Sequence, residues 1–166
     1  MLINLANLFN GSDEIVKIDY SFKIDDLFLN SFNPIKDKIF VKGTFFQEAG
    51  IVQCKLSVSF NYDGFCDRCA EPVHKEMSFE TNKVFVTHFE NDKDFEDYIV
   101  IDDASLNLDE FVREEILLFL PNKILCKENC KGLCPKCGKN LNDGKCDCKK
   151  DVDPRMEVLL QLLNEE

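Results

Sequence analysis

Six of the nine cysteines in this 166-residue chain fall between residues 126 and 148, in the segment CKENCKGLCPKCGKNLNDGKCDC. Thiols at this density serve one of three chemistries: disulfide bonds, thiol redox catalysis or metal binding. The segment has too few apolar side chains to build a core of its own. What the thiols bind therefore decides how this part of the chain folds.

A disulfide framework is the weakest of the three interpretations. Nine cysteines cannot all pair, and the first residues, MLINLANLFNGSDE, lack the basic start and cleavage site of a secretory signal. No apolar run approaches the roughly 18 residues that a membrane-spanning helix needs. We therefore expect a soluble, cytoplasmic protein with no membrane partner, in a compartment where stable disulfides are rare.

Metal binding fits the spacing of the thiols. Structural zinc takes four ligands in a tetrahedron, supplied by pairs two to four residues apart. A further pair lies in NYDGFCDRCAEPV, between two predicted strands, where a loop can present both sulfurs to one ion. The pairs are Cys66 and Cys69, Cys126 and Cys130, Cys134 and Cys137, and Cys146 and Cys148, and all but the last have that gap. We predict that these eight cysteines bind one or two structural zinc ions.

The spacing leaves two partitions open. In one, the last two pairs close a site within a single turn-rich ribbon, and Cys126 and Cys130 reach back to the CDRC loop. In the other, four of the six distal cysteines hold one zinc and the CDRC pair stays free. The sequence alone does not choose between them.

Thiol redox catalysis is the rival function, because a Cys-x-x-Cys pair can have a depressed pKa. That chemistry usually places the first cysteine at a helix N-terminus near a βαβ pattern, whereas the CDRC pair lies between strands. Glycine-rich phosphate loops, GxSxG elbows and HExxH helices are also missing from the sequence. We expect no catalytic residues, no small-molecule substrate and no enzymatic activity.

The first half of the chain has the period-two pattern of antiparallel strands. The segment IVQCKLSVSFNY alternates apolar and polar residues, and Cys54 falls on its apolar face, where a thiol packs as a small hydrophobic side chain. Ala49 and Gly50 join it to KIFVKGTFFQEAG in a predicted hairpin. A further strand is predicted over 73–89, with a break near residues 81 and 82.

A helix follows, with Asn107 as its N-cap, Glu110 completing a capping box and Pro121 as its stop. Its apolar stripe should cover one face of the sheet. The predicted fold class is α+β: a curled antiparallel β-sheet or partial barrel with a packed helix and a cysteine-rich, zinc-ribbon-like C-terminal annex. The expected units are the β-sheet region (1–89), an acidic connector with one edge strand and the capping helix (90–120), the zinc annex (121–150) and a C-terminal helix (151–166).

The formal charge of −11 argues against general affinity for nucleic acids. The charge is uneven, because residues 121–150 carry a local +5, part of which would compensate zinc-bound thiolates. If the annex contacts RNA, phosphates would meet a small set of basic side chains. These are Arg68, Lys131, Lys136, Lys139 and Lys145. No aromatic residue follows Phe119, so the annex offers no stacking platform for bases.

Four segments together resemble a known family: CDRCAEPV, EEILLFLPNKILC, CKGLCPKCGKNLNDGKCDC and DPRMEVLLQLL. They are similar, in order and over residues 54–163, to the YceD family of large ribosomal RNA subunit accumulation proteins. The resemblance implies a non-enzymatic role in 23S rRNA accumulation or processing and in large ribosomal subunit assembly. It implies 23S rRNA or a large-subunit ribosomal protein as the partner. It also favours one cysteine unit formed by the first two pairs and a second unit formed by the last two. A zinc-stabilised protein-interaction adaptor unrelated to ribosomes is the alternative, with a CxxC thiol oxidoreductase less favoured.

Overall fold

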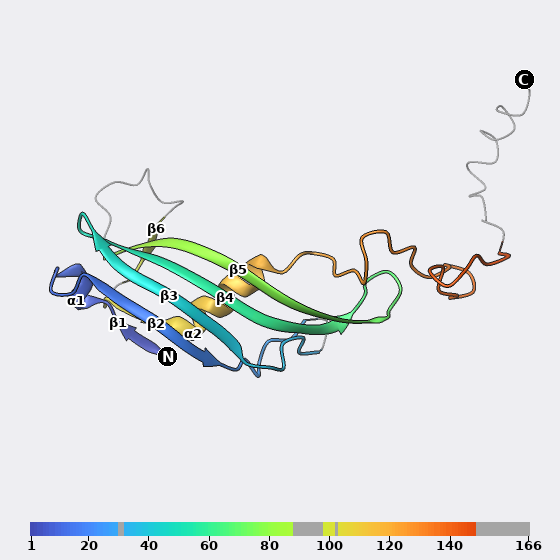
Figure 1. Cartoon of the computed structure of the whole chain (residues 1–166), viewed down its shortest axis with the longest axis horizontal. Coiled ribbons are helices and arrows are strands. Elements are labelled where there is room, and N and C mark those ends of the chain that lie inside the picture. The colour runs from blue at the N-terminus through green and yellow to red at the C-terminus, as the bar shows by residue number, and fades with distance from the viewer. Residues whose placement is uncertain (30–31, 88–97, 102, 149–166) are drawn as a thin grey trace, which may run out of the picture.

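A five-stranded sheet forms the body of the molecule (Figure 1). The structure is a computed structural model that describes residues 1–29, 32–87, 98–101 and 103–148. The sheet order is β2-β3-β4-β5-β6, with all neighbours antiparallel except β6, which runs parallel to β5. The strands are β2 (Ile15–Phe22), β3 (Ile39–Glu48), β4 (Ile51–Phe65), β5 (Pro72–Val86) and β6 (Tyr98–Val100).

A second, two-stranded sheet joins the N-terminal residues to the start of the main helix. Its strands are β1 (Leu2–Asn4) and β7 (Ser105–Asn107), and they pair antiparallel. The helices among the described residues are α1 (Ala6–Phe9), a single turn, and α2 (Leu108–Phe119). The sequence pattern predicted neither β1, α1 nor β7, because each is too short to show a period.

The α+β class and the largely antiparallel sheet are confirmed, but the sheet is open and does not close into a barrel. The edge strands β2 and β6 each have one hydrogen-bonded neighbour. Helix α2 covers the face that a barrel would have to enclose, with the ring centroids of Phe111 and Phe85 5.6 Å apart. Helix α2 therefore completes the core, and burial of this face does not require the edge strands β2 and β6 to pair with each other.

Strand β4 confirms the predicted alternation most clearly. The side chains of Val52, Cys54, Leu56, Val58, Phe60 and Tyr62 are all buried. Cys54 is 1% exposed and sits in the core, as expected. The hairpin to β3 turns through Ala49 (φ 53°) and Gly50 (φ 85°), both left-handed, which matches the right-handed twist of the paired strands.

The predicted break in the strand after residue 80 is wrong, because β5 runs unbroken through Thr81 and Asn82. Thr81 is 5% exposed and its hydroxyl donates a 2.6 Å hydrogen bond to Glu115 Oε2 on α2. Asn82 pairs across the ladder with Lys55. Thr81 therefore faces helix α2 and Asn82 faces solvent, and the strand continues through both residues.

Helix α2 begins after Asn107 and ends before Pro121, as predicted, but the capping box does not form. The Asn107 side chain makes no bond to the helix backbone, and its Nδ2 lies 3.4 Å from Glu110 Oε2. The N–H of Leu108 is bound instead by the carbonyl of Met1 at 2.9 Å. Pairing of β1 with β7 brings that carbonyl to the helix N-terminus.

The acidic connector contains the expected edge strand, β6. The predicted C-terminal helix over 151–166 and the predicted strand residue His88 lie outside the described residues. Within the described residues, no helix has the length and apolar character to span a membrane.

Candidate metal centres

The loop between β4 and β5 presents the first cysteine pair at the end of the sheet. Backbone hydrogen bonds close it, from the N–H of Cys66 to the carbonyl of Glu71 (2.8 Å) and from the N–H of Ala70 to the carbonyl of Cys66 (2.9 Å). Ala70 turns the chain in the left-handed region (φ 58°). Cys66 and Cys69 are 3% and 4% exposed, so both thiols lie in a small buried cluster.

The segment after α2 is fastened to this loop at several points. Asp67 donates its N–H to the carbonyl of Ile124 (2.9 Å), and its carboxylate Oδ2 accepts the N–H of Ile124 (2.5 Å). Lys75 Nζ donates to the carbonyl of Leu125 (2.9 Å), and Arg68 Nη1 donates to the carbonyl of Cys130 (2.9 Å). These bonds hold the second cysteine pair over the first.

The proximal set is the group Cys66, Cys69, Cys126 and Cys130, whose Sγ atoms all lie within 4.8 Å of one another. The Sγ atoms of Cys66 and Cys130 are 3.8 Å apart, and those of Cys69 and Cys126 are 3.6 Å apart. A tetrahedron of sulfurs around zinc has edges of about 3.8 Å, given zinc–sulfur bonds of about 2.3 Å. The separations therefore suit a shared metal ion and exceed the roughly 2 Å of a disulfide.

Backbone dipoles favour ionisation of part of the proximal set. Burial acts to raise the pKa of Cys66, but hydrogen bonds from the N–H groups of Cys126, Arg68 and Cys69 lower it to about 6. The N–H of Glu71 acts to lower the pKa of Cys69, but burial and the neighbouring thiols raise it to about 12. Thiolates this close repel one another, so all four would ionise together only around a cation.

The distal set is the group Cys134, Cys137, Cys146 and Cys148, again with all Sγ atoms within 4.8 Å. The first pair sits in a tight loop, in which Cys134 donates its N–H to Lys139 and accepts the N–H of Gly138, both at 2.9 Å. The N–H groups of Cys137 and Lys136, followed by the thiol of Cys146, lower the pKa of Cys134 to about 6. The distal set therefore has the same donor chemistry as the proximal set.

The structure brings the eight predicted cysteines together as two sets of four, and the CDRC pair is not left free. Cys54 belongs to neither set. Both sets could hold a metal ion, and their four thiolate donors fit the preferences of zinc. A four-thiolate site is closed, so a bound zinc would offset half of the thiolate charge and cross-link the chain.

The basic residues predicted for RNA contact lie in or beside the annex, and some make contacts within the protein. Arg68 is engaged with the Cys130 carbonyl, and Lys139 Nζ donates to the carbonyl of Lys145 (3.0 Å). Lys131 donates its backbone N–H to the side chain of Asn142, and Lys136 also has a partner. All five residues stay candidates for phosphate contact, and the bond from Arg68 to Cys130 also positions the second cysteine pair.

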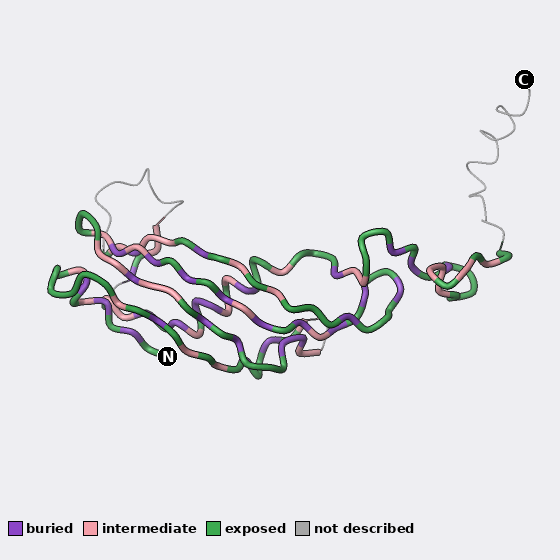
Figure 2. The backbone as a smooth tube through the Cα atoms, viewed as in Figure 1, coloured by how far each residue is buried: buried purple, intermediate pink, exposed green. Residues whose placement is uncertain are grey.

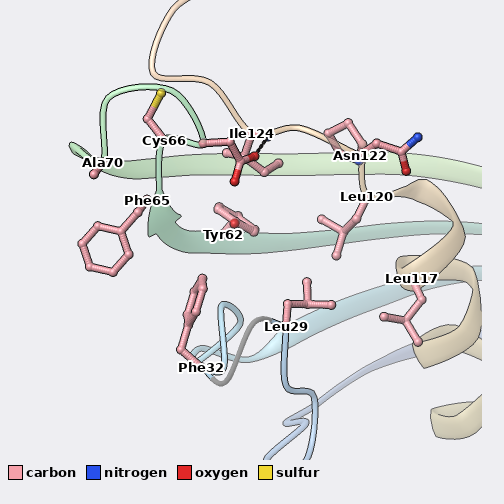
Figure 3. A pocket seen from close by; sticks show the side chains of 12 residues that line it. Leu29, Phe32, Tyr62, Phe65, Cys66, Ala70, Leu117, Leu120, Asn122 and Ile124 are labelled. Carbon is pink, nitrogen blue, oxygen red and sulfur yellow. Dashed lines mark hydrogen bonds between the residues drawn. The ribbon is translucent and has the colours of Figure 1, made fainter. Parts of the chain in front are cut away.

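A pocket of about 440 Å³ lies beside the proximal set (Figure 3). Tyr62 and Phe65 of β4 and Leu117 and Leu120 at the end of α2 contribute to its wall. Figure 3 shows the sulfur of Cys66 turned away from this pocket. The pocket and the metal set are thus neighbours that open to different sides of the loop.

The sequence interpretation missed the polar residues that assemble the annex, chiefly Asp67, Asn140 and Asn142. Their side chains bond to backbone or side-chain groups of other segments, and such contacts leave no periodic trace. The segment NLNDG was the one available signal, because asparagine and aspartate favour turns stabilised by their own side chains.

Comparison with known proteins adds a family match over most of the chain. Residues 54–163 match the family model described as large ribosomal RNA subunit accumulation protein YceD. The chain is 29% identical to YlbN of Bacillus subtilis over 160 residues, which cover 93% of this chain and 88% of that protein.

Two further relatives match over shorter stretches. The chain is 28% identical to Mb2951c of Mycobacterium bovis over 108 residues, covering 62% of this chain and only 51% of that protein. It is 37% identical over 46 residues to the chloroplastic large ribosomal RNA subunit accumulation protein YCED homolog 1 of Arabidopsis thaliana. That match covers 28% of this chain and 14% of the plant protein. No solved structure matches the chain.

Proposed function

Because the chain belongs to the YceD family, we propose that it supports 23S rRNA accumulation and large ribosomal subunit assembly as a non-enzymatic cytoplasmic factor. The observation that carries this proposal is the extent of the family match. It begins within β4 and continues past the last described residue, so it contains both cysteine sets. The part of the chain shared with the family is therefore the part that the thiols organise.

Zinc is the metal that we assign to both sets. Four thiolates with no open position suit a structural ion, whereas a catalytic zinc keeps a position for water or substrate. The proximal set would hold the annex against the end of the sheet, and the distal set would fold the ribbon beyond it. The chain's own bonds, such as those of Asp67 with Ile124, orient the ligands around this centre.

The proposed partner is 23S rRNA or a large-subunit ribosomal protein. Exposed lysines of the annex support contact with RNA phosphates, and the absence of aromatic side chains after Phe119 favours backbone contact over base reading. A second candidate function is a zinc-stabilised protein-interaction adaptor without a ribosomal role. The pocket beside the proximal set favours it, because Phe65 and Leu117 on its wall are exposed, and exposed apolar surface is typical of protein contact sites.

Deletion of the gene tests the first proposal against the second. We expect less mature 23S rRNA in the deletion strain, and co-sedimentation of the protein with large-subunit precursors. Complementation with wild type and with a matched cysteine variant that leaves both sets intact, Cys54→Val, should restore the RNA, whereas Cys66→Ser should not. Normal 23S rRNA levels and a protein found only in free fractions would favour the adaptor.

Elemental analysis of the reduced, folded chain tests the metal. We expect two zinc ions per chain. Folded annexes without any bound metal would contradict this assignment.

A further inference from the structure

The two cysteine sets are joined by a very short and well-packed linker. Only residues 131–133 separate Cys130, the last proximal ligand, from Cys134, the first distal one. Leu133 donates its N–H to the carbonyl of Arg68 (3.0 Å). Gly132 has a φ of +75°, and a Cβ there would lie 3.0 Å from the same carbonyl. The linker is therefore held against the CDRC loop and cannot move independently of it.

Two residues of the distal ribbon, Leu141 and Asn142, also contact the linker and the proximal set. Leu141 donates its N–H to the carbonyl of Gly132 (2.9 Å). The Asn142 amide spans the gap: its Oδ1 accepts the N–H of Lys131 (2.9 Å) and its Nδ2 donates to Cys130 Sγ (3.4 Å). A residue that lies between two distal ligands in sequence thus donates a hydrogen bond to a proximal ligand.

Asn142 is itself held in place. Asn140 Oδ1 accepts both the N–H of Asn142 (3.0 Å) and its Nδ2 (2.8 Å). Asn140 Nδ2 donates to Glu71 Oε1 in the CDRC loop (3.2 Å). Two asparagines therefore tie the distal ribbon to both halves of the proximal set.

We propose that Asn142 couples the two metal sites, so that a metal ion in either set strengthens metal binding in the other. A distal ion fixes the ribbon that presents Asn142, and the amide N–H then stabilises the negative charge on Cys130. Hydrogen bonds to ligand atoms tune metal affinity in this way. The effect must be reciprocal, because coupling between two binding sites acts equally in both directions. This inference rests on the proposed occupancy of both sets by metal.

The position of the amide supports this role. Asn142 Nδ2 lies 3.4 Å from Cys130 Sγ, and Asn142 belongs to the segment between the distal ligands Cys137 and Cys146. Loosening the ribbon would remove this donor from Cys130.

A double-mutant cycle on the reduced, metal-free full chain tests the coupling. Co²⁺ is titrated, and its thiolate absorption is followed, in wild type and in a distal knockout with Cys137→Ser and Cys148→Ser. The same titration is repeated in both backgrounds with Asn142→Ala. We expect proximal affinity in wild type to exceed that of the knockout by a factor between about 5 and 150, the usual range of coupling between sites. Asn142→Ala should abolish most of this difference.

Two further variants control the experiment. Asn142→Asp keeps an acceptor for Lys131 but cannot donate to Cys130, so it should lose coupling as alanine does. Asn122→Ala, in the exposed stretch that follows α2, should behave as wild type. Circular dichroism of the sheet confirms that each variant is folded.

The outcomes separate this inference from the metal assignment. Two bound ions with equal proximal affinity in wild type and the knockout would overturn the coupling alone. If Asn142→Ala lowers proximal Co²⁺ affinity equally in wild type and in the distal knockout, the coupling is also overturned. Asn142 would then act only as a local neighbour of Cys130. Failure of the wild type to bind any metal would overturn the metal assignment and the coupling with it.

Discussion

The proximal and distal sets share one ligand chemistry but differ in how the chain supports them. Three proximal cysteines are buried and Cys126 is half-buried, whereas Cys134 alone is buried in the distal set. Figure 2 shows the same contrast, with buried positions along the strands and at the junction and mostly exposed or intermediate positions at the outer end of the annex. The proximal set is part of the folded body, and the distal set depends on a small local ribbon.

The difference indicates separate tasks for the two sets. Proximal ligands come from the β4–β5 loop and from the segment after α2, so an ion there fixes the annex to the sheet. Distal ligands come from one continuous segment, so an ion there directly fixes only that segment and reaches the proximal set through Asn142. Loss of a proximal ion should therefore affect the whole annex, whereas loss of a distal ion should mainly affect the distal ribbon.

The largest expected effect is that of Cys66→Ser. Without this ligand the annex should detach from the sheet, because metal binding and folding are coupled in such sites. Limited proteolysis with mass spectrometry should show cleavage throughout 121–148, and zinc should fall from two ions to one. Cys137→Ser should confine cleavage to the distal ribbon and leave the sheet intact. An unchanged cleavage pattern in Cys66→Ser would remove the distinction between the sets.

Exposure of the distal ligands gives the next effect. A chelator added in excess should withdraw zinc in two resolved phases, with the distal ion released first because two of its four ligands, Cys137 and Cys148, are exposed. The release is followed with a zinc-sensitive dye. Cys137→Ser should lack the fast phase, and a single phase in wild type would contradict the predicted order.

A smaller effect is expected from the anchoring carboxylate. Asp67→Ala removes the acceptor of the Ile124 N–H and should lower proximal metal affinity about tenfold, as expected for loss of a hydrogen bond to a charged group. Distal affinity should change less. Asp67→Asn retains an oxygen acceptor and provides the matched control in the same Co²⁺ titration. Equal losses at both sets would show that the anchor does not distinguish them.

The smallest effect concerns Cys54, the cysteine outside both sets. Burial, with the charge of Glu115 adding to it, raises the pKa of Cys54 to about 12 from an ordinary value of 9.0. The unfolded chain therefore loses this proton first, and stability falls as pH rises from 9 towards 12. Urea denaturation should show about 1 kcal/mol of loss from this group between pH 8 and pH 10. Cys54→Val should lack that increment, and equal pH dependence in both proteins would contradict the assignment.

The parts of the fold with strong patterns were predictable from sequence. The alternation in β4, the hairpin at Ala49 and Gly50 and the apolar stripe of α2 each repeat a simple period, and the structure confirms them. The pairing of cysteines two to four residues apart likewise follows from ligand geometry. Such features are local, so a single sequence contains them.

The parts that escaped prediction depend on contacts between distant residues. Thr81 reads as a strand break until its hydroxyl is seen to bind Glu115 on α2. Asn107 is the N-cap residue, but its side chain makes no capping bond. The carbonyl of Met1, which the pairing of β1 with β7 places at the helix N-terminus, accepts the N–H of Leu108. The hydrogen bonds of Asp67 and Asn142 likewise form only when the annex is folded against the CDRC loop, so the sequence alone does not reveal them.

The pairing of Cys69 with Cys126 spans 57 positions along the chain, and that of Cys66 with Cys130 spans 64. Bringing such distant segments together costs chain entropy until the intervening strands and helix have formed. During synthesis, the second cysteine pair leaves the ribosome only after the whole sheet and α2. An ion bound at the junction would therefore be acquired late, and its capture would mark the moment at which the annex closes onto the sheet.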